Sequence, residues 1–472
     1  MPARPDATNP DRQPANGAMP TRAELRAMGQ LAMPVIVVQV GIMLMGVVDT
    51  IMVGRVSAEA LASVAIGNLY FFVLSMFGLG TLLALDPIVS QAVGADDERG
   101  IARALQRGLV LSVFLSLLVG TALLSAEPAL HLARQPVEII PDAAAYARIC
   151  IPGLPAFFAF GVFRQSLQAM RRMRPIVITI IAANLVNVFF NWVLIFGHLG
   201  SPALGAIGSA WASTVSRWLA VAAIIVTAWP ILRPYLRPLR GDSVAIRPLG
   251  RMLRLGTPVG LQQLLESAAF GAIGLLMGTF GTIQVAAHQV AINLASLTFM
   301  VPLAVGAAAA VMVGHAIGAG DALAARRAAG AALLWGAGFM CLSAMIFLVA
   351  PRALARLYTT DPQVLALAAL LIPIAGVFQV ADGLQAVSAG VLRGAGDTRT
   401  PLIVILLGFW LVGTPVSLFL AFRTPAGPAG LWWGLVAGLG SVAVLLLVRV
   451  RSKLRRPLSR VMMDDEQHVP AL

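Results

Sequence analysis

The sequence is poor in charged residues and in cysteine. Asp, Glu, Lys and Arg make up only 12% of its 472 residues, whereas soluble domains carry about 25%. Hydrophobic residues make up 58%, and the mean hydropathy is +0.85. These values exclude an ordinary soluble domain and predict an all-α polytopic membrane protein. The two cysteines, Cys150 and Cys341, match no metal or disulfide spacing, so we expect packing roles for them.

Motifs for catalysis and nucleotide binding are also missing. The sequence has no P-loop, which excludes direct drive by ATP, and no Ser/His/Asp or HExxH constellation, so we expect no enzyme activity and no cofactor. The formal charge of +13 could suggest a nucleic-acid partner. However, the basic residues lie in short connections between apolar runs, which is the topology signal of a membrane protein. The predicted partner is therefore the lipid bilayer and not nucleic acid.

Twelve apolar segments are long enough to cross a bilayer, which takes about 20 residues. They span residues 31–54, 61–90, 105–126, 143–168, 175–197, 204–229, 252–280, 284–315, 327–350, 363–391, 401–422 and 427–449. When the connections are assigned to alternating sides, 26 of the 34 basic residues fall on one side and 6 on the other. This bias predicts that both termini lie in the cytoplasm. Residues 1–30 are expected to form a disordered cytoplasmic tail, and residues 451–472 a second tail.

The two halves of the chain repeat each other at an offset of 224 residues. The sequence Met-Pro-Val at 33–35 aligns with Thr-Pro-Val at 257–259, and QAVGADDERGIARA (91–104) aligns with HAIGAGDALAARRA (315–328). The repeat predicts two pseudo-symmetric six-helix lobes (6+6) at 31–232 and 252–450, joined by a cytoplasmic linker at 233–251. An even number of helices in each half makes them parallel repeats, and two such lobes suit alternating access.

Three acids are predicted to lie within membrane spans. Asp49 interrupts the first apolar segment, Glu266 the seventh and Asp382 the tenth. An ionised carboxylate within a span costs about 2.5–3.5 kcal/mol on insertion scales, so these acids are expected to face the bundle interior and bind a cation. We expect no basic partner near them inside the membrane, which implies an external cation. For Asp49 the alternative is a helix-end acid that reaches interfacial water. We assign that role to Asp86, at a helix end near the cytoplasmic interface, although its position within the segment is otherwise unexplained.

Neutral polar residues accompany these acids. Asn184, Asn187 and Asn191 share one helix face, and Ser213 follows in the next span. With Asp49, their oxygens could bind Na⁺ or a proton held on the acid. The asparagines could equally form hydrogen bonds between helices. In the second half, His288 is more often a packing residue than a titrating one in such a context.

The sequence resembles the MATE (multidrug and toxic compound extrusion) family, within its NorM-like bacterial branch, from about residue 28 to 450. The resemblance rests on MGVVDTIMVG (45–54), QAVGA (91–95), LGTPVGLQQLLE (255–266), VAAHQVAINLASLTFMVPLAVGAA (285–308), VGHAIG (313–318) and ADGLQAVSAGVLRGAGDTR (381–399). It implies a functional monomer in a bacterial inner membrane that exports hydrophobic organic cations and drugs in exchange for inward Na⁺ or H⁺.

The resemblance also implies roles for individual residues. Asp49, Asn187, Asn191, Ser213, Glu266 and Asp382 would couple the cation, with Glu266 and Asp382 as possible Na⁺ ligands. Asp49, Glu266, Asp382, Gln289 and His288 would meet the substrate. Asn191 stands where the related DinF-like branch has an acid, which argues against a proton relay confined to the first lobe.

Two other functions stay open at this stage. A flippase for lipid-linked precursors could use a similar fold, but it should line its cleft with basic residues, and only Arg164 and Arg217 lie within spans. A structural or sensory membrane protein would not need unpaired acids in its spans. The sequence does not distinguish Na⁺ from H⁺ as the coupling ion.

Overall fold

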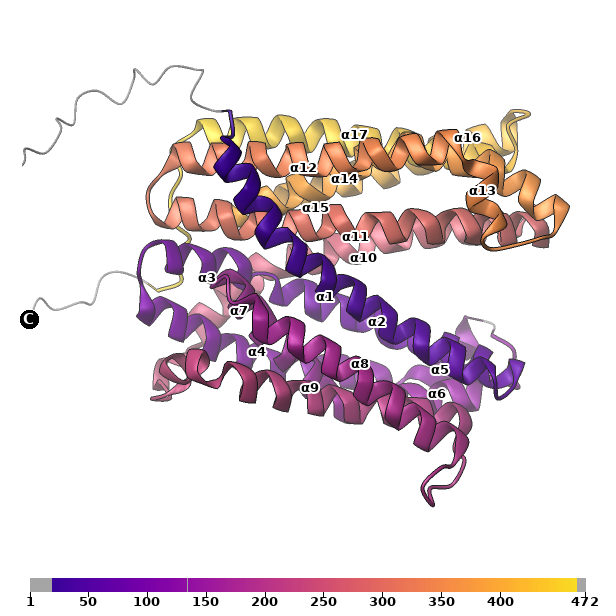
Figure 1. Cartoon of the computed structure of the whole chain (residues 1–472), viewed down its shortest axis with the longest axis horizontal. Coiled ribbons are helices and arrows are strands. Elements are labelled where there is room, and N and C mark those ends of the chain that lie inside the picture. The colour runs from indigo at the N-terminus through magenta and orange to yellow at the C-terminus, as the bar shows by residue number, and fades with distance from the viewer. Residues whose placement is uncertain (1–18, 134, 465–472) are drawn as a thin grey trace, which may run out of the picture.

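The protein is a bundle of long helices that run roughly parallel to one another (Figure 1). The computed structural model describes residues 19–133 and 135–464. Within these residues, twelve helices or broken helices are long and apolar enough to cross a membrane, and no strand is present. A helix satisfies its own backbone hydrogen bonds in lipid, which is why apolar segments of this length become helices. The predicted all-α architecture with twelve spans is confirmed.

The spans are divided evenly between two lobes. The first lobe contains α1 (Arg22–Gly54), α2 (Ala58–Leu82), α3 (Leu85–Gly94), α4 (Glu98–Leu124), α5 (Ala126–Leu132), α6 (Ile140–Ile149), η2 (Ile151–Gly153), α7 (Leu154–Ala169), α8 (Met173–Phe196) and α9 (Gly205–Leu236). After η3 (Gly241–Val244), the second lobe contains α10 (Ile246–Gly278), α11 (Thr282–Gly318), α12 (Ala322–Val349), α13 (Pro351–Arg356), α14 (Pro362–Gly394), α15 (Arg399–Ile405), the π-helix η4 (Leu406–Gly413), α16 (Thr414–Arg423) and α17 (Pro428–Arg455).

The packing of the helices follows the sequence repeat. α1 packs against α8 of its own lobe and against α11 of the other, and its counterpart α10 packs against α15 of its own lobe and against α2 of the other. Equivalent residues also cap equivalent helices. The Asp97 side chain accepts a hydrogen bond from the Gly100 amide at the start of α4, and Asp321 accepts one from Ala324 at the start of α12. The two lobes are therefore related by the parallel pseudo-symmetry that the offset of 224 residues predicts.

Three predicted boundaries need correction. The first helix begins at Arg22 and not at Leu31, because Thr21 and Glu24 form a capping box that the apolar pattern does not show. The predicted tail at 1–30 is therefore helical from Arg22 onward, while residues 1–18 lie outside the described part. The linker is shorter than 233–251, because α9 continues to Leu236 and α10 starts at Ile246. α17 continues to Arg455, beyond the predicted lobe boundary at 450.

Two spans are broken next to a proline. The second span is interrupted between α2 and α3, where Pro87 has no N–H to donate to the Leu83 carbonyl and the Asp86 amide bonds to that carbonyl instead. Pro155 similarly follows the 3₁₀ turn η2 between α6 and α7. After the break, α3 packs against α11 of the other lobe.

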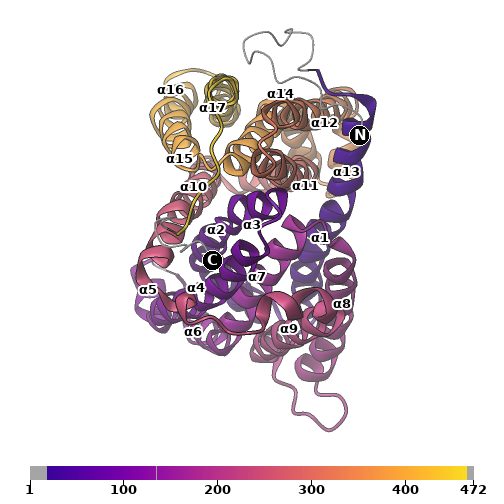
Figure 2. The same cartoon turned by 90° about the vertical axis from the view of Figure 1, so that its left-hand side faces the viewer.

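The lobes meet most closely at the end of the bundle where α1 begins and α17 ends, here called the termini side (Figure 2). α3 and α11 lie side by side there, on either side of the pseudo-symmetry axis. A side-chain carbon added to Gly94 would lie 2.1 Å from the His315 carbonyl oxygen, and one added to Gly318 would lie 2.1 Å from that of Gln91. These reciprocal contacts are possible only because both positions are glycine.

Candidate functional site

The first polar cluster in the membrane is centred on Asp49 of α1. Asn191 of α8 donates a hydrogen bond of 2.5 Å to one carboxylate oxygen of Asp49, and Ser213 of α9 donates one of 3.2 Å to the other. Asn191 also donates to the Asn187 side-chain oxygen over 3.2 Å. Three helices thus bring together the four residues that the sequence analysis assigned to the first-lobe cation site.

The local geometry explains why two of the three asparagines take part. Asn187 and Asn191 are one helical turn apart and fully buried, so both face α1 and α9. Asn184, a turn earlier, donates instead to the backbone carbonyls of Gly41 and Ile180. The expected asparagine face therefore divides into a helix–helix contact at Asn184 and a cluster around Asp49.

The surroundings of Asp49 are mostly neutral. Among the described residues no basic group forms an ion pair with it, but Arg217 is near enough to interact electrostatically. The prediction that no basic residue lies near the acids is therefore wrong for Asp49. The Arg217 guanidinium lies 4.0 Å from the centre of the Phe71 ring, a cation–π arrangement that holds it off the carboxylate. The side-chain oxygen of Asn191 is buried without a hydrogen-bond partner, so an oxygen ligand remains free beside Asp49.

The second polar cluster joins α10 and α14 of the other lobe. Gln385 donates a hydrogen bond of 2.8 Å to Glu266, and Glu266 interacts electrostatically with Asp382. One oxygen of Asp382 and the side-chain oxygen of Gln385 are buried without a hydrogen-bond partner. Next to them, Gln379 donates to Thr298 of α11 over 2.6 Å. Sequence reasoning assigned no role to Thr298, although a hydroxyl in a long apolar helix could have signalled one.

The remaining two predicted substrate residues lie outside both hydrogen-bonded clusters. The His288 ring is buried and packs edge-on against Trp432 at a centroid distance of 5.4 Å, and its Nδ1 has no hydrogen-bond partner. Gln289, the next residue on α11, is exposed and donates to Asn293. Neither is hydrogen-bonded to Glu266 or Asp382 within residues 19–133 and 135–464, so their assignment to a substrate site stays a prediction.

Asp86 lies near the start of α3, and it also has a partner that the sequence did not predict. It is fully buried, and its carboxylate forms an ion pair of 3.0 Å with Arg393 on α14. The sequence predicts a helix-end position, and the break at Pro87 provides one in the first turn of α3, between the lobes. Asp86 and Arg393 thus tie the two lobes together. The sequence did not predict Arg393 as this partner, because an arginine near a helix end is usually interpreted as a topology signal.

Further contacts between the lobes surround this ion pair. The Gln91 side chain donates to the Gly394 carbonyl on α14 over 2.9 Å, and His315 bonds to the Ala169 carbonyl on α7 over 2.6 Å. Because Gln91 and His315 are 224 residues apart, these bonds are related by the repeat. The termini side is therefore closed by paired polar contacts as well as by close helix packing.

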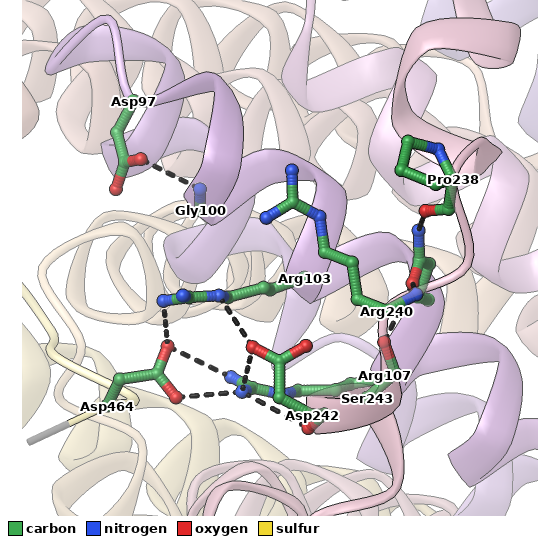
Figure 3. A network of polar contacts seen from close by, with 10 residues as sticks. Asp97, Gly100, Arg103, Arg107, Pro238, Arg240, Asp242, Ser243 and Asp464 are labelled. Carbon is green, nitrogen blue, oxygen red and sulfur yellow. Dashed lines mark hydrogen bonds and ion pairs between the residues drawn. The ribbon is translucent and has the colours of Figure 1, made fainter.

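The residues after α17 cross over to the first lobe and add a polar network (Figure 3). The Asp464 carboxylate forms ion pairs with Arg107 at 2.7 Å and with Arg103 at 3.0 Å, both on α4. Arg103 also pairs with Asp242 of the linker at 2.9 Å. Closer to α17, Arg460 pairs with Asp97. We call residues 457–464 the tail strap.

Charge keeps the acid of the tail strap ionised. Burial raises the pKa of Asp464, but hydrogen bonds and positive charge from Arg107 and Arg103 outweigh this effect and hold the pKa below its ordinary value of 3.8. The strap is also bound through its backbone. The Val461 amide donates to the Gln91 side chain over 2.7 Å, and the Met463 carbonyl accepts from Arg251 over 2.8 Å.

The kinds of side chain present indicate which ions the two polar clusters could bind. No group of three or more His, Cys, Asp and Glu side chains able to hold a metal ion occurs in the described part of the chain. Both polar clusters offer carboxylate and amide oxygens instead, which suit a hard monovalent cation or a proton.

Comparisons with known proteins point the same way. The MatE family model matches residues 34–193 and 258–419, one segment in each lobe. The chain is 39% identical over 434 residues to the multidrug resistance protein NorM of Burkholderia vietnamiensis, covering 90% of this chain and 93% of that protein. It is 36% identical over 450 residues to the multidrug resistance protein PmpM of Pseudomonas aeruginosa, covering 94% of each.

Solved structures share the fold. The eukaryotic MATE transporter AtDTX14 superposes with a TM-score of 0.83 at 24% identity, covering 92% of this chain and 98% of that one. The Vibrio cholerae MATE transporter VcmN in its bent form gives a TM-score of 0.82 at 19% identity, covering 93% and 98%.

Proposed function

The chain belongs to the MatE family, and from this membership we propose that it exports hydrophobic organic cations and drugs across a bacterial inner membrane in exchange for inward Na⁺ or H⁺. The relatives named as multidrug resistance proteins match over nearly the whole chain, so the proposal concerns the complete two-lobe fold. We propose a functional monomer with both termini in the cytoplasm, which makes the termini side the cytoplasmic side.

The observation that carries the proposal is the set of neutral partners around Asp49. Asn191 and Ser213 donate hydrogen bonds to the carboxylate but bring no charge. A negative charge within the membrane is costly unless a cation offsets it. Arg217 offsets it only from a distance, because its guanidinium lies over Phe71. Asp49 is therefore suited to bind a mobile cation, either a proton on the carboxylate or Na⁺ among the oxygens of Asp49 and Asn191.

The second cluster fits the same requirement. Asp382 and Glu266 place two acids close together without an ion-pair partner among the described residues. The unpartnered oxygens of Asp382 and Gln385 could complete an Na⁺ site with Glu266. A cationic drug in the same lobe would meet the same negative charge. Ion and drug would then oppose each other's binding, which is the negative coupling that exchange requires.

Alternating access explains how this competition becomes transport. The contacts at the termini side, including the Asp86–Arg393 ion pair and the tail strap, hold the cytoplasmic ends of the lobes together. Loading of drug from the cytoplasm requires these contacts to separate. Ion entry from outside takes place while they are formed. One elementary charge moving down 100 mV yields about 2.3 kcal/mol, or roughly fiftyfold in drug gradient, so one or two ions are enough for useful efflux.

The experiment that tests the proposal neutralises the three acids at once. In cells that lack other exporters, we expect the Asp49→Asn, Glu266→Gln, Asp382→Asn triple variant to give no protection against ethidium. The matched control replaces three exposed acids at the opposite side, as Glu59→Gln, Glu138→Gln, Asp142→Asn, and should protect as the wild type does. Full resistance from the first triple variant, at equal amounts of membrane protein, would exclude the carboxylate mechanism.

A further inference from the structure

The arginines at the end of α17 and just after it fall into two groups. Arg449 pairs with Asp397 at 2.7 Å, and Arg460 pairs with Asp97, so these two stabilise the fold. Three arginines between them differ. Arg451, Arg455 and Arg456 are exposed, and no ion pair or hydrogen bond of their side chains occurs within the described part of the chain.

These three arginines share one surface. With Val448 and Ser452 they line an open groove of about 590 Å³. The spacing of three and four residues from Val448 through Ser452 to Arg455 places the lining residues on one face of the helix. Three guanidinium groups and a hydroxyl thus converge where α17 leaves the membrane, with no acid among the residues that line the groove.

The same face of α17 becomes apolar toward the membrane interior. Val448 and Val444 precede Arg451 by about one and two turns, and they are 62% and 60% exposed. They belong to a helix that is apolar enough to span the bilayer. The outer face of α17 therefore presents an apolar strip that ends in a triple positive charge at the membrane surface. A phospholipid has the complementary arrangement, with acyl chains below and a phosphate at the interface.

We propose that the groove at Arg451, Arg455 and Arg456 binds the headgroup of an anionic phospholipid from the surrounding leaflet. The guanidinium groups would form charge-assisted hydrogen bonds to the phosphate oxygens, and Ser452 could donate another. The acyl chains would lie along Val444 and Val448. Basic clusters next to a spanning helix select anionic lipids in this way. The site is separate from the acid clusters and does not depend on the transported substrate.

Native mass spectrometry of the full-length protein tests this site. The protein in detergent is titrated with phosphatidylglycerol or with phosphatidylcholine of the same acyl chains, and the bound lipid is counted. An arginine near the membrane surface contributes roughly fivefold to the binding of an anionic lipid. We therefore expect the Arg451→Gln, Arg455→Gln, Arg456→Gln variant to lose at least tenfold in phosphatidylglycerol affinity at the tightest site, with phosphatidylcholine binding unchanged.

Two controls make the result decisive. The variant Arg352→Gln, Arg356→Gln, Arg423→Gln removes the same charge from exposed residues at the opposite side and should keep the tight site. Inorganic phosphate is added at the concentration at which phosphatidylglycerol saturates the site. It should not displace the bound lipid, because the acyl chains contribute to binding. Equal phosphatidylglycerol affinity in the wild type and the first variant, an equal loss in the second, or displacement by free phosphate would each overturn the proposal. Because the three side chains are exposed and unpaired, single substitutions can replace the triple variant if it folds poorly.

Discussion

At the scale of single residues, the partners of an acid decide its role more than its depth does. Asp86 and Asp49 both lie within spans of the first lobe. Asp86 has a fixed counter-ion in Arg393, so its charge is used to join the lobes. Asp49 has hydrogen-bond donors without charge and no ion-pair partner among the described residues, as the proposed binding of a mobile cation requires. The two acids are expected to respond differently to neutralisation.

Replacement of Asp49 by Asn should stabilise the protein while it stops transport. The substitution keeps the shape of the side chain and removes a charge that costs about 2.5–3.5 kcal/mol within a span. We expect a higher midpoint of thermal unfolding together with loss of ion-driven ethidium efflux. Thermal unfolding in detergent and efflux from proteoliposomes measure the two effects. A lower midpoint would show that Asp49 is structural. Ser213→Ala is the control, because it removes a hydrogen bond to Asp49 but keeps the charge of that carboxylate.

Replacement of Asp86 by Asn should have the opposite effect on stability. Removal of one partner from a buried ion pair costs about 3–5 kcal/mol, because the other charge is left without compensation. We expect Asp86→Asn to lower the midpoint of thermal unfolding, and the additional change Arg393→Gln to restore part of the loss. If the double variant loses as much as the sum of the two single variants, the pair does not contribute as a unit.

At the scale of helices, close packing of α3 on α11 should depend on particular glycines. A methyl group at Gly318 would meet the Gln91 carbonyl oxygen, so Gly318→Ala cannot keep the observed contact between the lobes. We expect this variant to open the termini side, which thiol labelling of a cysteine placed at Ser90 would detect as at least a tenfold faster reaction. Gly338→Ala on α12, where no atom lies within 4 Å of the added carbon, is the matched control. Equal labelling of both variants would contradict this role for the contact.

The tail strap should depend on charge but not on pH in the physiological range. Because the pKa of Asp464 is lowered below 3.8, its contribution is fully present above that value and is lost only as the pH falls through the lowered pKa. Hydrogen exchange at the Val461 amide, which donates to Gln91, should be protected equally after correction for intrinsic rates at pH 6 and pH 8. Asp464→Asn should speed this exchange several-fold, and Asp142→Asn should not. A strap that loosens between pH 8 and pH 6 would contradict the assignment.

Sequence patterns predict helices well here and their interruptions poorly. The apolar runs give all twelve spans because lipid requires each one to be helical. The break before Asp86 depends on a single missing donor, at Pro87, and the extension of α1 back to Arg22 depends on a capping box. Such features involve one or two hydrogen bonds, which a periodicity averaged over a helix cannot resolve. The crossing of the tail strap to α4 is a long-range contact without a local signal.

At the scale of the whole molecule, a symmetric scaffold carries asymmetric sites. The repeat places Ile273 at the position equivalent to Asp49, and Ile42 at the position equivalent to Glu266. The contacts that close the termini side, by contrast, are repeated, as in the pair Gln91 and His315. The pseudo-symmetry is therefore kept by the contacts that close the termini side, and each lobe has its own polar cluster.

The candidate sites could be predicted in part from the sequence. The acids and the asparagines stand out because polar groups in apolar helices are costly, and the structure brings Asp49, Asn187, Asn191 and Ser213 together. Other features depend on how the helices are rotated against each other. These are the separate position of Asn184, the partner of Asp86 and the contact between Gln379 and Thr298. Helix rotation is set by packing between distant segments, so one sequence does not reveal it.

The most direct test of the account is an ion step applied to ethidium-loaded proteoliposomes that contain oriented protein. With the pH clamped, an Na⁺ step is applied; in a second experiment without Na⁺, a pH step is applied. We predict that at least one step drives ethidium movement in the wild type and that Asp49→Asn abolishes it, while the variant remains folded. Movement at the wild-type rate in Asp49→Asn, or movement that neither ion affects, would contradict the claim that a mobile cation at Asp49 is exchanged for the drug.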